Sequence, residues 1–269
     1  MAIIPVDSVD DPRIAVYRDL KLAFAKRRQF LFVVEGLVLT ERLLASDIRV
    51  DSVLAEQRHV DRLQPQMPED APLFVAQREL MEEVAGFKFH RGVLGCGRRP
   101  FPVDLPRTMQ SAPPRSIITV CVGIRDPENL GSVVRCSAAF GVHAVMLGPS
   151  CCDPFYRRVA RTSMGANMEV PIVESADLRA DLLSLRRKFD VRLIATVLDE
   201  GAQPLNDSER PDRVALLFGS EGFGLEQPWV EMCDDRVTIP MSRLVDSLNV
   251  SVAAGIFLHH FSSPSSSSS

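Results

Sequence analysis

The sequence predicts an α/β protein with a mostly parallel sheet in its second half and a smaller α/β unit before it. Short apolar runs alternate with helix-spaced segments along most of the chain, and a proline-dense stretch divides them into two series. Strands that alternate with helices are typical of a doubly wound parallel sheet. The 269 residues are 46% hydrophobic and 25% charged, which excludes a chain that is disordered along most of its length.

The first unit opens with a helix-like apolar stripe over 12–28 that ends in Lys26, Arg27 and Arg28. An apolar run at 30–34 then predicts a strand, and the spacing over 37–44 predicts a helix. Later runs predict strands at 52–55, 73–76 and 92–96 and a helix at 77–84. These elements form a predicted N-terminal unit over 1–106.

A proline-dense stretch follows, with prolines at 100, 102, 106, 113 and 114. Proline fixes φ and lacks a backbone N–H, so this stretch predicts an extended connection between two domains, with the linker at 107–115.

Acidic charge is concentrated beyond this boundary. Through Gln110 there are 16 basic and 16 acidic residues, leaving 15 and 19 in the second half, where all of the net charge of −4 lies. A pI of about 5.8 argues against a protein that coats nucleic acid without specificity, although local basic patches remain open.

The second half, 116–261, begins with a fully apolar run typical of a strand buried on both faces. Runs of this kind predict strands at 116–122, 144–147, 192–198, 213–218 and 236–239. Helical spacing predicts helices at 130–140, 176–189 and 248–260. The serine-rich tail, 262–269, cannot bury a core and is expected to be disordered.

Six cysteines occur without a Cys-x-x-Cys pair or a zinc-like Cys/His spacing, so we expect reduced structural thiols and no metal. The adjacent Cys151 and Cys152 are expected to be packed thiols, because neighbouring cysteines bridge only with strain. The N-terminus has no signal-peptide pattern, and no apolar run reaches the roughly 20 residues that span a membrane. The sequence therefore predicts a cytoplasmic protein without a membrane partner.

Ligands of such a sheet bind beyond the carboxyl ends of its strands, so the residues there are the candidates for chemistry. After the first strand, Asn129 and Gly131 open a helix that carries Arg135 within a small, apolar stretch. Asn129 as a helix cap and Gly131 as a packing position would explain the first two. Arg135 stays unexplained, because a buried arginine needs a partner or a ligand.

A glycine-rich turn follows the strand at 213–218. Gly219, Gly222 and Gly224 surround one carboxylate, Glu221, and permit a close backbone approach to a ligand. The spacing matches neither a P-loop nor a dinucleotide fingerprint. After the last strand, three small polar residues, Ser247, Asn249 and Ser251, precede a long apolar helix, where capping explains one of them.

Together these segments resemble the three ordered motifs of the SpoU family of RNA ribose 2′-O-methyltransferases, within the SPOUT class. The resemblance covers roughly 117–260. It is carried by Asn129-Leu130-Gly131 with Arg135, by Gly219-Ser220-Glu221-Gly222 with Gly224, and by Ile239-Pro240-Met241 with Ser247-Leu248-Asn249. Ser163-Met164-Gly165-Ala166 is similar to a further family segment, and Val33-Val34-Glu35-Gly36 resembles the opening of the family's ribosomal-protein-like RNA-binding domain.

The resemblance implies a sheet with a C-terminal trefoil knot, a homodimer and S-adenosyl-L-methionine as cofactor. It implies cofactor-binding residues at Thr196, Val197, Leu198, Gly201, Gly219, Ile239, Met241 and Leu248. The catalytic set it implies is Arg135, Asn129, Glu221, Ser247 and Asn249. Because arginine normally stays protonated, we expect Arg135 to bind phosphate and position the ribose hydroxyl, with Glu221 and Asn129 orienting it.

RNA contact is expected from Arg27, Arg28, Arg157, Arg158, Arg161 and Ser163, with Arg98 and Arg99 as further basic candidates. A solvated charged surface is the alternative for each basic group. Aromatic residues are 6% of the chain and Trp229 is the sole tryptophan, so base stacking on an exposed ring is not the expected mode.

The substrate implied is ribosomal or transfer RNA, with ribosomal RNA favoured by the N-terminal unit. A non-catalytic RNA-binding protein and an enzyme that methylates a base nitrogen remain alternatives. The first would have lost residues such as Arg135, Glu221 or Asn249, and the second fits the Asn129 and Arg135 motif less well. The five histidines suggest no hydrolase arrangement.

Overall fold

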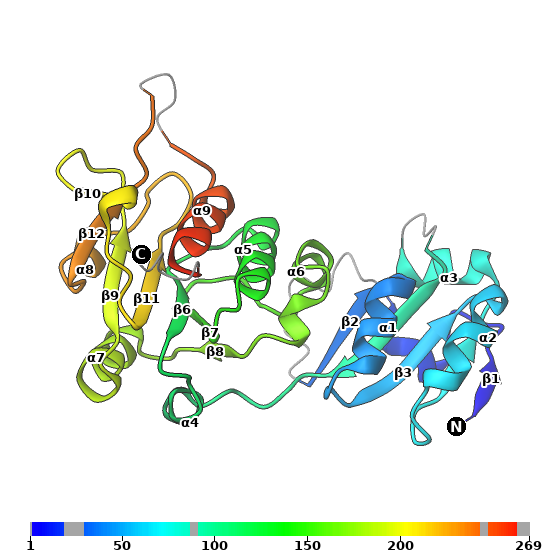
Figure 1. Cartoon of the computed structure of the whole chain (residues 1–269). Helices are drawn as coiled ribbons and strands as arrows, with labels where there is room; N and C mark the ends of the chain where they lie inside the picture. Colours follow the sequence, from blue (N-terminus) through cyan, green and yellow to red (C-terminus); the bar gives the residue numbers. More distant parts are fainter. Residues whose placement is uncertain (1, 19–29, 87–90, 243–246, 263–269) are drawn as a thin grey trace, which may run out of the picture. The chain divides into compact units, whose positions relative to one another are not determined.

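The computed structural model describes residues 2–18, 30–86, 91–242 and 247–262. The chain forms two compact units (Figure 1). Unit 1 comprises Met1–Phe101 together with Phe155–Met168, and unit 2 comprises Pro102–Pro154 together with Glu169–Ser269. Arg27 and Arg28, two of the predicted RNA contacts, lie outside the described residues, as does the serine-rich tail beyond Ser262.

Unit 1 contains a five-stranded mixed sheet in the order β1-β4-β3-β5-β2. Its strands are β1 (Ile3–Pro5), β2 (Leu31–Glu35), β3 (Val50–Ala55), β4 (Leu73–Val75) and β5 (Val93–Arg98). The first three in this order are parallel, whereas β5 is antiparallel to both of its neighbours. Four of the strands, β2 to β5, were predicted within two residues, and β1 was missed because its apolar run is too short to show a period.

Helices cover both faces of this sheet. They are α1 (Leu37–Ala45), α2 (Val60–Leu63), α3 (Arg78–Ala85) and α6 (Arg157–Thr162). One core gathers around Leu39 and Leu43 of α1, and the other contains Met81 of α3 and Tyr17, whose hydroxyl lies 2.8 Å from Ser52 Oγ. The helix predicted over 12–28 is a 3-10 helix at Pro12–Tyr17, with 19–29 outside the described residues.

The segment Phe155–Met168 packs in unit 1, although the sequence placed it inside a second domain at 116–261. Phe155 packs against Phe32 of β2 with ring centroids 5.1 Å apart. Arg157 donates to Glu35 at 2.8 Å, and Arg42 donates to the carbonyl of Met164. The apolar side of α6 is buried against β2, and this burial explains why the segment leaves the unit that surrounds it in sequence.

The proline-dense stretch is not extended throughout, because it contains the helix α4 (Leu105–Gln110). The carboxylate of Asp104 caps the helix by accepting from the backbone N–H of Arg107 at 3.3 Å. Pro106 stands in the first turn, where a missing N–H leaves no hydrogen bond unmade. The predicted linker at 107–115 is therefore wrong over its first half, where buried Met109 belongs to the core of unit 2.

Unit 2 contains a seven-stranded sheet in the order β10-β12-β9-β11-β6-β7-β8, in which every pair is parallel. The strands are β6 (Ser116–Cys121), β7 (Ala144–Leu147), β8 (Ile172–Glu174), β9 (Arg192–Thr196), β10 (Gln203–Pro204), β11 (Arg213–Phe218) and β12 (Asp235–Thr238). The predicted parallel sheet is confirmed, and β7 and β11 have the predicted bounds. The missed strands, β8 and β10, have three and two residues.

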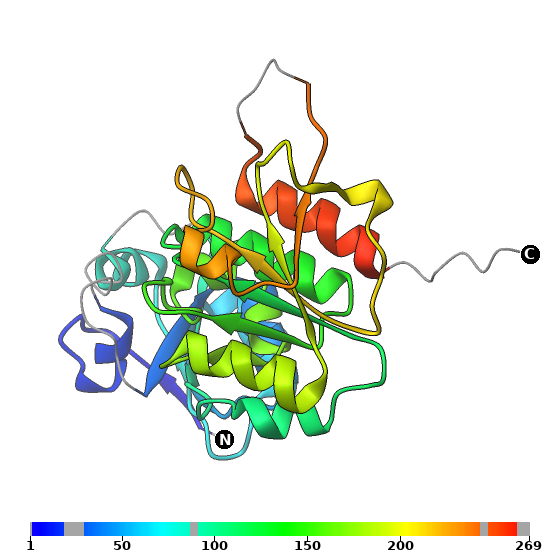
Figure 2. The ribbon, with the colours of Figure 1, turned by 90° about the vertical axis from the view of Figure 1, so that its left-hand side faces the viewer.

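Helices lie on both sides of this sheet (Figures 1 and 2). They are α5 (Pro127–Ala139), α7 (Leu178–Phe189), α8 (Gln227–Val230) and α9 (Val250–Ser262), besides α4. One core joins α4 and α7 to alternate strand residues such as Ile118 and Leu217. On the other face α5 and α9 lie side by side, and Phe257 of α9 meets Phe218 edge to face at 5.9 Å. Among the described residues, no helix is long and apolar enough to cross a membrane.

Candidate active site

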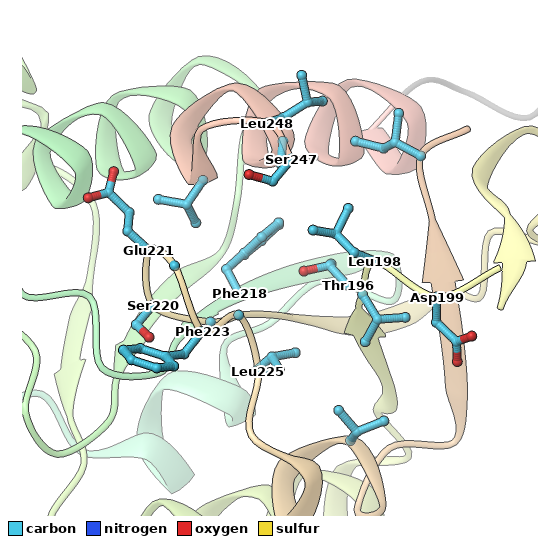
Figure 3. Close-up of a pocket in the computed structure, with 18 of the residues that line it drawn as sticks. Thr196, Leu198, Asp199, Phe218, Ser220, Glu221, Phe223, Leu225, Ser247 and Leu248 are labelled. Carbon is cyan, nitrogen blue, oxygen red and sulfur yellow. The ribbon is translucent and has the colours of Figure 1, made fainter. Parts of the chain in front are cut away.

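A cavity of about 550 Å³ lies at the carboxyl ends of β9, β11 and β12 in unit 2 (Figure 3). Because the three strands are parallel, the loops that follow them meet at one edge of the sheet. The lining comes from 196–199 after β9, from 218–225 after β11, and from Ile239, Met241, Ser247–Val250, Ala253 and Phe257. Its size is within the range of small-molecule sites.

The loop after β11 is closed by its own backbone. Ser220 and Gly224 form a bridge, with Ser220 N donating to Gly224 O at 3.1 Å and Gly224 N donating to Ser220 O at 2.9 Å. A Cβ on Gly219 would lie 2.0 Å from the carbonyl carbon of Gly224. Gly219 is thus required by the close approach of two backbone segments, and the positive φ of Gly222 and Gly224 completes the turn.

Three polar side chains from distant parts of the sequence meet beside this cavity. Asn129 Nδ2 donates to Glu221 Oε1. Asn249 Nδ2 donates to Asn129 Oδ1 at 2.9 Å and to Glu221 Oε1 at 3.1 Å. We call Asn129, Glu221 and Asn249 the polar cluster. One residue from each of the three motifs therefore joins a single hydrogen-bonded network.

The ends of two helices place the polar cluster. Asp126, rather than Asn129, caps α5, and its carboxylate accepts from the backbone N–H groups of Glu128 at 2.7 Å and Asn129 at 3.0 Å. The Asn129 side chain is thereby free for Glu221. Asn249 both caps α9 and belongs to the polar cluster. Its Oδ1 accepts from the backbone N–H of Ser251 at 2.8 Å, while its Nδ2 donates to Asn129 Oδ1.

Arg135 lies on the exposed face of α5, two turns beyond the start of the helix. The sequence indicated a buried arginine, and that expectation is wrong for the single chain. Arg135 and Asn129 are six residues apart, so they point to different sides of the helix. Within the described residues, Arg135 has no hydrogen bond to Glu221 or Asn129 and does not line the cavity. The expected orientation of Arg135 by these two residues is absent from the single chain.

Most of the residues predicted to bind cofactor line the cavity: Thr196, Val197, Leu198, Gly219, Ile239, Met241 and Leu248. Ser247 lines it as well, and Figure 3 shows its hydroxyl beside the same space. The exception is Gly201, which lies outside the described lining and donates its N–H to Asp199 Oδ1 at 2.8 Å. The hydroxyl of Thr196 donates to the carbonyl of Leu217 at 2.8 Å, so it ties β9 to β11.

Sequence reasoning missed several lining residues, among them Asp199, Phe218 and Phe223. Asp199 directly follows a predicted strand, and this position was a signal for it. Phe223 stands between two glycines of the predicted turn. The sequence did not predict a binding role for it, because aromatic residues are few. The residue is 91% exposed.

The cysteines near this edge of the sheet are free and protonated. Burial, reinforced by Cys151, raises the pKa of Cys152 to about 12. Burial also raises the pKa of Cys121 and of Cys151. All six cysteines are free, as expected of packed thiols. The described residues contain no group of three or more His, Cys, Asp or Glu side chains that could hold a metal.

The basic residues expected to contact RNA separate into two kinds in unit 1. Arg157 is 18% exposed and pairs with the 9% exposed Glu35, so it is part of the packing. Ser163 is buried, and its hydroxyl donates to Asn167 Oδ1 at 3.1 Å. Both side chains are therefore engaged in contacts inside unit 1. Arg158 and Arg161 are exposed on α6.

Together, the fold and the site define an α/β protein with a small-molecule cavity at the carboxyl edge of a parallel sheet and a polar cluster beside it. The family model of the SpoU rRNA Methylase family matches residues 116–259, which is more than half of the chain. The chain belongs to this family.

Two relatives extend the similarity beyond this region. The chain is 36% identical to an "Uncharacterized tRNA/rRNA methyltransferase" of Mycobacterium bovis over 256 residues, covering 92% of this chain and 87% of the relative. It is 33% identical to the 23S rRNA (guanosine-2'-O-)-methyltransferase RlmB of Acinetobacter baylyi over 188 residues, covering 68% and 75%.

Solved structures share the fold at lower identity. The AdoMet-bound rRNA methyltransferase from Sinorhizobium meliloti superposes with a TM-score of 0.80 at 22% identity, over 96% of this chain and 97% of that one. The SpoU methyltransferase AviRb from Streptomyces viridochromogenes, in complex with AdoMet, gives a TM-score of 0.79 at 21% identity, over 94% and 97%. The α/β fold with a parallel sheet is therefore that of known SpoU methyltransferases.

Proposed function

We propose that this chain transfers a methyl group from S-adenosyl-L-methionine to a ribose 2′-hydroxyl in structured RNA, with ribosomal RNA favoured over transfer RNA. The observation that carries the proposal is the polar cluster of Asn129, Glu221 and Asn249 beside the cavity, in a member of the SpoU family. The RlmB relative, whose name gives 23S rRNA as its substrate, supports the choice of ribosomal RNA.

The cavity fits the proposed cofactor. The backbone contact between Gly219 and Gly224 fixes the loop that forms one wall of the cavity. The apolar side chains of Leu198, Ile239 and Leu248 offer a slot for an adenine ring. The hydroxyl of Ser247 and the carboxylate of Asp199 supply polar partners for the amino-acid end and the ribose. When bound, S-adenosyl-L-methionine supplies a methyl group on a positively charged sulfonium.

The chain's own contribution is to place the hydroxyl and to assist loss of its proton. A ribose hydroxyl is a weak nucleophile until its proton is drawn away during attack. In our proposal Arg135 binds a phosphate beside the target ribose and positions the hydroxyl. Glu221 stays fixed by two amide groups, so its carboxylate keeps one orientation toward the substrate.

A second copy of the chain would bring Arg135 to a site. The exposed side of α9 carries Val252 and Ile256 one turn apart, next to α5 with Arg135. Apolar side chains in such a stripe favour a protein interface. We therefore include a homodimer in the proposal, with these faces of α5 and α9 in contact. Sedimentation equilibrium should give twice the chain mass, and the mass of one chain at micromolar concentration would contradict the dimer.

The proposal has three further parts. Unit 1 is the RNA-binding domain, corresponding to the predicted 1–106 with the segment Phe155–Met168 added. The C-terminal segment forms a trefoil knot, supported by the strand order, in which β11 lies between β9 and β6 while α9 returns from the far edge to pack on α5. The compartment is the cytoplasm, supported by six free cysteines.

The decisive experiment supplies the full chain with tritiated S-adenosyl-L-methionine and total RNA from a host that lacks the gene. We expect incorporation into ribosomal RNA, and mapping should place the label at one ribose as a 2′-O-methyl group. Asn249→Ala is the negative control because it removes two contacts of the polar cluster. Label confined to transfer RNA would show that transfer RNA is the substrate, and label on a base would show that the enzyme methylates a base instead of a ribose. Cofactor binding without labelled RNA would indicate a non-catalytic RNA-binding protein.

Two neighbouring arginines of α6 should behave differently. Arg158→Ala should leave folding unchanged, weaken binding of ribosomal RNA, and lower the salt dependence of binding by about one ion. Arg157→Ala should reduce stability by about 2 kcal/mol, because Glu35, at a site with little solvent, loses its partner at 2.8 Å and keeps the more distant Arg91 at 3.9 Å. Urea unfolding and filter binding at several salt concentrations measure the two effects. Equal loss of RNA affinity in both variants without destabilisation would contradict this assignment.

A further inference from the structure

The function proposed above assigns no role to Phe223, the most exposed of the described aromatic residues at the cavity. Phe223 lines the cavity, and the residue is 91% exposed. Single exposed apolar residues are common on protein surfaces and alone indicate nothing. Here the exposure is combined with a rigid support and with closeness to the polar cluster, and these two features give the ring a role.

The support is the bridged turn after β11. The reciprocal hydrogen bonds between Ser220 and Gly224 close the turn on both sides of Phe223. Gly222 and Gly224 both have positive φ, so the chain reverses sharply before and after the ring. Gly219 packs against the backbone of Gly224, which leaves the base of the turn little room to move. A bulky apolar side chain is thereby held in solvent by a constrained backbone.

The position of the ring relates it to the reacting ribose. Phe223 is two residues from Glu221, so their Cα atoms are at most about 7 Å apart. Figure 3 shows the Glu221 carboxylate and the Phe223 ring extending in different directions from this one loop. The loop therefore brings a carboxylate of the polar cluster and an aromatic ring to the lining of one cavity.

We propose that Phe223 is a positioning residue that stacks on the base of the target nucleotide. This inference rests on the proposed ribose methylation and adds the way in which the nucleotide is held. Every nucleobase has a π face, and proteins that hold unpaired bases stack them on aromatic side chains. The ring would fix the base while the polar cluster fixes the sugar, and stacking would require the target nucleotide to be unpaired. The proposal departs from the expectation that base stacking on an exposed ring is not the mode of RNA recognition.

The test compares Phe223→Leu with Phe223→Trp in the full chain, with ribosomal RNA from the host that lacks the gene as substrate. Leucine keeps an apolar side chain but removes the π face, whereas tryptophan keeps it. We expect Phe223→Leu to raise the KM for RNA about 10-fold with kcat changed less, and Phe223→Trp to restore the wild-type value. The affinity for S-adenosyl-L-methionine, measured by calorimetry, should be the same in all three proteins.

Phe189→Leu is the control for loss of an aromatic ring elsewhere in unit 2, since Phe189 ends α7 and lies outside the cavity lining. It should leave the KM unchanged. Three results would overturn the stacking role. The first is an unchanged KM in Phe223→Leu, and the second is a fall in cofactor affinity as large as the rise in KM. The third is dissociation of the Phe223→Leu dimer into monomers while the remaining dimer keeps full activity. If the wild-type chain methylates no RNA at all, both the proposed function and the stacking role are wrong. If the wild type is active and Phe223→Leu has the same KM, only the stacking role is wrong.

Discussion

Replacing Arg135 with alanine is expected to lower methyl transfer to RNA at least about 1,000-fold while leaving cofactor affinity within about twofold of wild type. The guanidinium presents a rigid fork of donors that matches a phosphate. Without it the ribose hydroxyl would no longer be held in line with the methyl donor. Because Arg135 does not line the cavity, the cofactor site should be untouched.

The measurement pairs single-turnover methylation of ribosomal RNA with calorimetric titration of S-adenosyl-L-methionine. Arg179→Ala is the matched control, since Arg179 is an exposed arginine on α7, on the opposite face of the sheet. It should methylate RNA at the wild-type rate. Turnover by Arg135→Ala within a few-fold of wild type would remove Arg135 from the mechanism.

Gly219→Ala is expected to reduce the affinity for S-adenosyl-L-methionine at least about 100-fold and to abolish activity with it. The new Cβ would stand 2.0 Å from the carbonyl carbon of Gly224, and its other near neighbours are backbone atoms of Gly224 and Leu225. Backbone cannot swing aside as a side-chain end can, so the turn must open and the bridge between Ser220 and Gly224 must break.

Gly255→Ala in α9 is the control for this substitution. Its Cβ would meet Cys136 Sγ at 3.6 Å, an ordinary contact, and alanine is favoured over glycine inside a helix by about 1 kcal/mol. This variant should bind cofactor normally and melt at the same or a higher temperature. Normal cofactor binding by Gly219→Ala, measured by the same titration, would show that the loop does not form the cofactor site.

The parallel sheet of unit 2 could be predicted because its buried strands are long apolar runs with few competing patterns. The strand β11, for example, has five buried residues in sequence before the glycine turn. Strands of two or three residues, such as β8 and β10, contain too little sequence to show a period. The sequence does not predict the helix α4, because a run of prolines favours extended chain, whereas Pro106 stands in the first turn, where helices accept proline.

The polar cluster could also be predicted in outline, since its members follow the carboxyl ends of parallel strands or begin the helices beside them. What the sequence could not predict depends on contacts between distant segments. The pairing of Arg157 with Glu35 joins residues 122 positions apart and converts an expected RNA contact into a packing element. Likewise, nothing in the local pattern distinguishes the buried arginine expected at 135 from the exposed one observed.

The placement of Phe155–Met168 with unit 1 means that the chain passes from one unit to the other three times, after Phe101, after Pro154 and after Met168. A cut or a gene fusion at residue 101 would therefore not yield two intact modules. The downstream piece would carry away Phe155 and α6 and expose the apolar side that packs on β2, while the upstream piece would lose one wall of its core. Recombination between relatives could therefore exchange these units intact only by joining sequences at three points at once.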